Sequence, residues 1–196
     1  MYKRQVYDID AGIDFLVKQG YEEIVLIGHS TGANKVSFYS GRKNDPRILG
    51  VILISPISDR LVPQKVSTNH NGDLLSMNRF IDQGKGDELM PGKIFFPLTP
   101  KRFVSLYSRG SEEDTFDYGD PQPKMNYFSK ITKPLLVIFA EKDESSDRPM
   151  YQIKNIFDAC STSRHYESTI VKNAFHSFGE RENLLIELIM TWVLKL

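Results

Sequence analysis

The sequence predicts a three-layer α/β/α fold, in which helices cover both faces of a mostly parallel β-sheet. The first observation is a set of short, continuous apolar runs bounded by turn residues, at positions 24–27, 48–56 and 135–140. Runs of this length and composition are typical of strands that are buried on both faces. The second observation is that segments with helical spacing of apolar residues alternate with these runs, as parallel sheets require. At 196 residues, the chain is long enough to bury a sizeable core.

The first part of the chain predicts a helix, a strand, a second helix and a second strand. Residues 6–20 place apolar side chains on one helical face and end in a glycine. The apolar run 24–27 follows as a strand. Residues 30–40 then fit a helix that stops at Gly41. The run 48–56 ends at a proline and predicts the next buried strand.

The last third of the chain continues the alternation. A strand is expected at 135–140, immediately after Pro134, and a helix at 148–160. Residues 166–171 then predict a strand. Residues 181–196 predict a terminal helix that is apolar around much of its circumference.

The alternation is lost in the middle of the chain. The stretch is rich in Gly, Pro, Asn and Asp, and it is too long to be a structureless loop in a compact domain. We therefore expect a cap or lid insertion at 59–130, built mostly of short helices over the carboxyl edge of the sheet. The spacing at 74–81 indicates one helix, and Thr99-Pro100 indicates the start of another. Residues 1–58 and 131–196 would then form the core.

Composition argues against several classes of function. The 25 basic and 25 acidic residues balance, and the basic residues are scattered, so a nucleic-acid partner is not expected. No apolar run reaches membrane-spanning length. The four histidines (His29, His70, His165, His176) lack metal-ligand spacing, and we expect neither a metal nor another cofactor.

The single cysteine indicates a reducing environment. Cys160 shares a helical face with Ile153, Ile156 and Phe157, which predicts a buried structural thiol. Because the sequence holds no disulfide framework and no pattern of a signal peptide, we expect a cytoplasmic protein.

The segment Gly28-His29-Ser30-Thr31-Gly32 follows the first buried strand directly. A strand that turns at once into a helix leaves the turning residue in a strained backbone conformation, with its side chain projecting from the sheet end. Only small neighbours are expected to fit beside it. This is the mechanical meaning of the G-x-S-x-G nucleophile elbow, and strand, turn and helix are all predicted around it.

A serine nucleophile needs a base, and the base needs a group that orients it. Asp143 lies just beyond the strand 135–140, and His176 follows the strand 166–171. The carboxyl ends of parallel strands share one sheet edge, where ligands bind in open α/β sheets, so both residues are expected beside Ser30.

With "GHSTG", "FAEKD" and "NAFHSF" in this order, the chain resembles the second half of an α/β-hydrolase fold protein. The resemblance implies that Ser30 is the nucleophile, His176 the general base and acid, and Asp143 the orienting carboxylate. It also implies that the backbone N–H of Thr31 donates to the oxyanion. The implied activity is hydrolysis of ester-like or amide-like carbonyls of a small molecule, without a cofactor.

Several assignments stay open at the level of sequence. Asp59 and Asp147 are alternative acids, although Asp147 precedes a predicted helix start and fits an N-cap. His29 is expected to pack or to hydrogen-bond locally, and His70 and His165 read as ordinary polar positions. Insertion aromatics suggest an apolar substrate pocket, or else the insertion's own core: Phe95, Phe96, Phe103, Tyr107, Phe116 and Tyr118.

The resemblance covers only the C-terminal portion of the family fold. Strands that normally precede the elbow strand, and the loop with the second oxyanion donor, have no counterpart here. We therefore expect the strand 24–27 to be an edge that promotes self-association, and this 196-residue form to have little activity. A catalytically inactive fragment or interaction module, and an acyltransferase with the same triad, are the alternatives.

Overall fold

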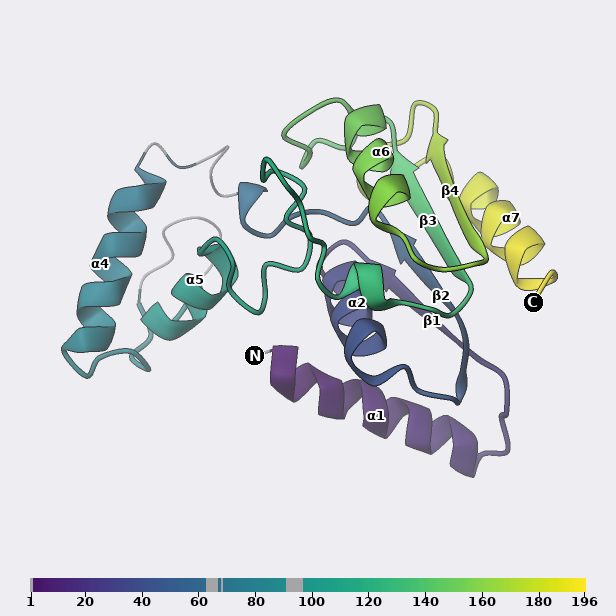
Figure 1. The fold of residues 1–196 in the computed structure, drawn as a ribbon, viewed down its shortest axis with the longest axis horizontal. Helices are drawn as coiled ribbons and strands as arrows, with labels where there is room; N and C mark the ends of the chain where they lie inside the picture. Colours follow the sequence, from purple (N-terminus) through teal and green to yellow (C-terminus); the bar gives the residue numbers. More distant parts are fainter. Residues whose placement is uncertain (1, 63–66, 68, 91–96) are drawn as a thin grey trace.

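The computed structural model describes residues 2–62, 67, 69–90 and 97–196, and it has the expected layers of helices around a sheet (Figure 1). The described elements, in chain order, are α1 (Tyr2–Lys18), β1 (Ile24–His29), α2 (Thr31–Lys43), β2 (Ile48–Ile54), α4 (His70–Asp82), α5 (Pro100–Tyr107), the 3-10 turn η1 (Phe128–Lys130), β3 (Leu135–Ala140), α6 (Met150–Cys160), β4 (Tyr166–Val171) and α7 (Glu182–Val193).

The described sheet has the order β1-β2-β3-β4, and all three pairings are parallel, which confirms the predicted sheet. Its register brings the carboxyl ends of the strands together, since His29 lies opposite Ile54 and Ala140 opposite Val171. β1 is an edge strand of this sheet, as predicted, and the Ile27 side chain on it is 49% exposed.

Both faces of the sheet are covered, and β3 shows why a continuous apolar run was needed. All six of its residues are buried, and they alternate between two cores. Leu135, Val137 and Phe139 join the core formed with α1, α2 and α6. Leu136, Ile138 and Ala140 join a second core on the other face of the sheet. Helix α7 covers this core with Trp192 and several half-buried residues. This confirms the three-layer fold.

Helix α2 differs from the prediction at its end. Gly41 does not stop the helix, which continues to Lys43 and ends at Asn44 in the left-handed conformation with φ of 44°. A Cβ atom at Gly41 would lie 2.0 Å from the backbone oxygen of Tyr127. The glycine is therefore required by a close approach between two chain segments and not by the helix end.

The middle of the chain contains a small helical unit. Helices α4 and α5 lie side by side at one end of the molecule (Figure 1), with Met77, Phe103, Leu106 and Tyr107 buried between them. The start of α5 agrees with the sequence, because the Thr99 hydroxyl accepts a hydrogen bond from the Arg102 N–H at 3.2 Å. The division into a core and a cap at 59–130 stays a prediction.

The insertion aromatics divide between two cores. Phe103 and Tyr107 pack within the helical unit, as the core alternative predicted. Phe116 and Tyr118 instead join the main core, where the Phe116 ring lies 5.1 Å from the ring of Phe157. The predictions for Phe95 and Phe96 fall outside the described residues.

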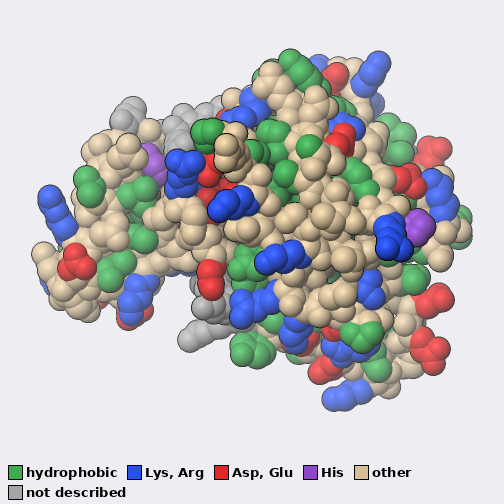
Figure 2. Space-filling view, viewed as in Figure 1, with side chains coloured by type: hydrophobic (Ala, Val, Ile, Leu, Met, Phe, Trp, Pro, Cys, Tyr) green, Lys and Arg blue, Asp and Glu red, His purple; other side chains and the backbone are tan. Residues whose placement is uncertain are grey.

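Cationic and anionic side chains are interspersed over the face seen in Figure 2. In the described ranges, no helix combines the length and apolar character that a membrane crossing requires. Cys160 is half-buried beside the main core and not fully buried as predicted, and its sulfur lies 3.9 Å from the Pro123 carbonyl oxygen.

Candidate active site

Ser30 lies in the tight turn between β1 and α2 with φ of 57° and ψ of −126°. For a residue with a Cβ atom this backbone conformation is strained, and such residues concentrate at functional sites. The Ser30 N–H donates to the Ile54 carbonyl at 3.0 Å, which attaches the turn to β2. Although Ser30 precedes the helix, its hydroxyl makes no capping hydrogen bond. The hydroxyl therefore has no structural duty in the helix.

The two glycines of the elbow have different roles. A Cβ atom at Gly28 would lie 2.4 Å from the Gly32 backbone oxygen and 2.8 Å from the Ala33 Cα. A Cβ atom at Gly32 would meet no atom within 4 Å beyond its own helix and chain neighbours. The expectation that only small neighbours fit is therefore right for Gly28 and wrong for Gly32.

Asp143 and His176 form a direct pair at the carboxyl edge of the sheet. The distance from Asp143 Oδ2 to His176 Nδ1 is 2.8 Å. The other carboxylate oxygen accepts the Ser145 N–H at 2.9 Å, and the Asp143 side chain is fully buried. A carboxylate fixed in this way holds the imidazole with the proton on Nδ1, so that Nε2 is left as the basic nitrogen.

The hydrogen bond with Asp143 raises the pKa of His176 above its ordinary value, against the opposing effect of burial. The negative charge of Asp143 and then that of Glu144 act in the same direction as the hydrogen bond. A base with a raised pKa is a stronger proton acceptor, but it needs a higher pH to be neutral.

The elbow contacts the loop that carries His176 (residues 172–181, the histidine loop) through the side chain of His29. Its Nε2 lies 2.9 Å from the His176 carbonyl oxygen, and the two rings are 5.2 Å apart. No hydrogen bond joins the Ser30 hydroxyl to the His176 ring, both of which belong to the described part of the chain. In unliganded enzymes such contacts are often long, and the assignment of the triad stays a proposal.

Thr31 is the first residue of α2 and is exposed. The N–H groups of the first helical turn have no acceptor within their own helix. The Thr31 N–H therefore lies beside Ser30 at a helix N-terminus, where negative charge is favoured.

The two alternative acids form hydrogen bonds with residues other than His176. Asp59 accepts a hydrogen bond from the Asn34 amide at 2.9 Å, one helical turn after Ser30. Asp147 pairs with the neighbouring Arg148 at 2.7 Å. It does not cap α6, whose N-cap residue is Pro149 with no side-chain hydrogen bond, so that expectation was wrong.

The remaining histidines divide into one exposed and one buried residue. His165 is exposed, as expected of a polar position. His70 is only 7% exposed and packs beside the rings of Phe103 and Tyr107. Among the described residues, neither of its ring nitrogens has a hydrogen-bond partner. The description of His70 as an ordinary polar position was therefore wrong.

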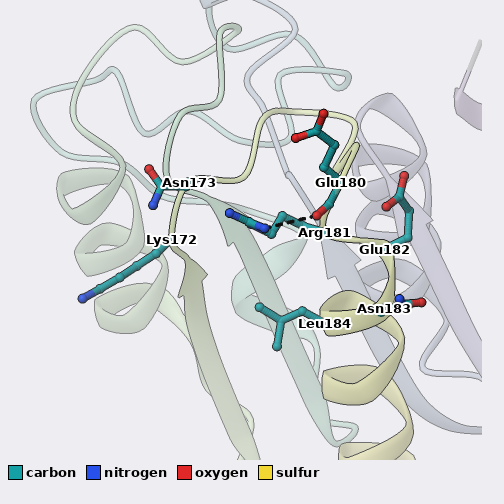
Figure 3. Close-up of a pocket in the computed structure, with 7 residues that line it drawn as sticks. All are labelled: Lys172, Asn173, Glu180, Arg181, Glu182, Asn183 and Leu184. Atoms are coloured by element: carbon teal, nitrogen blue, oxygen red, sulfur yellow. Dashed lines mark hydrogen bonds between the residues drawn. The ribbon is translucent and has the colours of Figure 1, made fainter.

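A surface pocket of about 450 Å³ lies on the outer side of the histidine loop, between the end of β4 and the start of α7 (Figure 3). Its lining mixes two cations with two carboxylates: Lys172, Asn173, Glu180, Arg181, Glu182, Asn183 and Leu184. Neither Ser30 nor His176 lines it, so it is separate from the candidate active site.

Sequence reasoning missed two residues that contact the histidine loop. The Ser55 hydroxyl donates to the His176 carbonyl at 3.2 Å, and Glu144 Oε2 accepts the His176 N–H at 3.0 Å. Ser55 directly follows β2, and Glu144 follows the predicted acid. Their positions after strand ends are a signal that could have found them.

The family comparison covers almost the whole chain. A family model described as a protein of unknown function (DUF1749) matches residues 2–194. The UPF0613 protein PB24D3.06c of Schizosaccharomyces pombe is 26% identical over 92% of this chain. The chain spans 66% of that relative's length.

Solved structures share the fold. The siderophore hydrolase EstB from Aspergillus fumigatus matches 87% of this chain with a TM-score of 0.65 and 24% identity, and this chain spans 65% of its length. Est1E from Butyrivibrio proteoclasticus matches 100% of this chain with a TM-score of 0.66 and 20% identity, over 70% of its own chain. At these identities the similarity concerns the fold alone.

Proposed function

Since the chain belongs to the DUF1749 family and has the α/β-hydrolase fold, we propose that it is a serine hydrolase acting on ester-like or amide-like carbonyls. The observation that carries the proposal is the Asp143–His176 pair, at 2.8 Å, on the same sheet edge as the strained Ser30. A histidine whose pKa is raised by a carboxylate partner, on the same sheet edge as a strained serine, is an arrangement that suits acyl transfer.

In the first step, His176 Nε2 accepts the proton of the Ser30 hydroxyl while Ser30 Oγ attacks the carbonyl carbon. Asp143 keeps Nδ1 protonated and stabilises the imidazolium that forms. The carbonyl oxygen becomes an oxyanion, to which the Thr31 N–H donates at the N-terminus of α2. His176 then gives its proton to the leaving group as the acyl-enzyme forms.

In the second step, water takes the place of the leaving group. His176 removes a proton from the water, whose oxygen attacks the acyl carbon, and returns the proton to Ser30 as the acid product leaves. This sequence needs no cofactor, because both nucleophiles are oxygen atoms activated by one base.

The chemistry of the candidate site and the neighbours support a proposal for the substrate class. A siderophore hydrolase and a structure of Est1E with ferulic acid are among the similar folds. We therefore propose a small-molecule ester with an apolar part as the substrate.

Labelling with a fluorophosphonate probe tests the nucleophile. We expect Ser30 to be modified, and the Ser30→Ala variant to lose the signal. Ser177→Ala is the matched control, because this exposed serine is adjacent to His176. Equal labelling of Ser30→Ala would show that a different serine reacts.

A second measurement separates the alternatives. Turnover of a p-nitrophenyl ester is measured with and without an added alcohol or amine. We expect release of p-nitrophenol with the free acid as the second product, and loss of this release in Ser30→Ala. Faster release with an ester or amide as the product would instead favour the acyltransferase. A well-folded but inactive chain would favour the interaction module.

A further inference from the structure

The main chain of His176 is held from both sides. Its N–H donates to Glu144 Oε2 at 3.0 Å. Its carbonyl oxygen accepts from His29 Nε2 at 2.9 Å and from the Ser55 hydroxyl at 3.2 Å. A carbonyl oxygen only accepts, so His29 must carry a proton on Nε2.

The three partners lie at or just after the ends of three different strands. His29 is the last residue of β1 and directly precedes Ser30, Ser55 directly follows β2, and Glu144 lies in the loop after β3. Ser55 is 1% exposed and adopts a φ of 42°, an unfavourable conformation for a residue with a Cβ atom. These contacts tie the histidine loop to the carboxyl edge of the sheet at each of the three strand ends.

We propose that His29, Ser55 and Glu144 are positioning residues that hold the His176 backbone, and with it the imidazole, against the nucleophile elbow. The proposal rests on the proposed function. It assigns a role to His29, which lies between Gly28 and Ser30 in the elbow. Because His29 is covalently attached to Ser30, its hydrogen bond fixes the histidine loop relative to the nucleophile directly. A base misplaced by about 1 Å costs on the order of a hundredfold in rate.

Glu144 has a second effect through its charge. Within the described part of the chain, the charged or titratable side chains that face His176 are Asp143 and Glu144 from the loop after β3 and His29 from β1. The Glu144 charge acts in the same direction as Asp143 and raises the pKa of His176. Glu144→Gln keeps an oxygen acceptor for the His176 N–H and removes only the charge, whereas Glu144→Ala removes both.

Nuclear magnetic resonance tests the Glu144 contact without relying on activity. The chain has only four histidines, so their ring signals can be assigned by substitution. We expect Glu144→Gln to lower the His176 pKa, because the nearby negative charge is lost. We expect Glu144→Ala also to speed hydrogen exchange of the His176 amide at least tenfold. The control is Glu141→Ala. Glu141 Oε2 accepts the N–H of Asn173, another residue of the histidine loop, at 2.8 Å, so this variant removes an equivalent contact that does not involve His176.

Turnover of a p-nitrophenyl ester tests the His29 contact. His29→Leu removes the donor, and we expect kcat to fall about ten- to a hundredfold with KM little changed. His29→Gln places an amide N–H near the former Nε2 and should restore much of the loss.

The two readouts distinguish the failures. If the parent protein has no esterase activity, or if its activity survives in Ser30→Ala, the proposed function is contradicted. The resonance data would then still test the positioning contacts. An active parent in which His29→Leu leaves kcat unchanged would overturn the positioning role. So would an unchanged His176 pKa in Glu144→Gln together with an unchanged amide exchange rate in Glu144→Ala.

Discussion

Replacing Gly28 by alanine is the most direct test of the elbow geometry. The new Cβ would lie 2.4 Å from the Gly32 backbone oxygen, 2.6 Å from the Gly32 carbonyl carbon and 2.8 Å from the Ala33 Cα. All three contacts are with backbone atoms, so no side chain can rotate away to relieve them. Either β1 or the start of α2 must shift, and Ser30 lies between them.

The cost follows from the overlap. Overpacking of this kind destabilises by about 1–3 kcal/mol, occasionally more. For a domain of this length, 1 kcal/mol lowers Tm by roughly 2–4 °C, so we expect a decrease of about 2–12 °C. Gly32→Ala is the matched control: its Cβ would have open space beyond its own helix, and it should be neutral or stabilise by up to about 1 kcal/mol through helix propensity.

Equilibrium unfolding in urea, with thermal unfolding alongside, measures both variants. The expected order of stability is Gly32→Ala, then the parent, then Gly28→Ala, with the first two close together. Equal stability of Gly28→Ala and the parent, or a larger loss in Gly32→Ala, would refute the steric argument for the elbow.

Three further predictions concern the site, the core and the edge. Asp143→Asn removes the partner that raises the pKa of His176. Because the base works when neutral, the acid limb of the pH profile of kcat/KM should move from above pH ~6.5 toward lower pH. We also expect kcat to fall by on the order of 10⁴. A limb that stays in place would contradict this. Arg60→Met should destabilise by about 3–5 kcal/mol in urea, because it removes the ion-pair partner of the Asp114 carboxylate, whose side chain is only 2% exposed. Arg109→Met, at an exposed ion pair, should cost at most about 1 kcal/mol, and equal losses would refute the distinction. Ile27→Lys, on the edge strand β1, should reduce self-association in light scattering, and an unchanged particle mass would count against this edge as the contact.

Much of the sheet could be predicted because its signals are local. The run 135–140 is apolar at every position, and all its residues are buried. Parallel strands bring their carboxyl ends to one edge whatever the loops do. The sequence therefore predicted that Asp143 and His176 would meet there, and in the structure they are paired.

Other features could not be predicted from neighbouring residues. Gly41 resembles a helix stop, but it is there because the Tyr127 backbone passes over it. His70 looks like a surface residue, but α5 buries it. In both cases the deciding neighbour is far away in the sequence, and composition gives no sign of it.

The sequence by itself determined the order of strands and helices, the strained turn at Ser30 and the sheet edge where the polar residues gather. These depend on apolar periodicity and on small residues at a turn, which act over a few positions. Only the tertiary structure decided which groups hold the histidine. The contact between His29 and the His176 carbonyl joins residues 147 positions apart. It exists because the four strands β1, β2, β3 and β4 pair in parallel and bring the end of β1 and the loop after β4 to the same edge of the sheet.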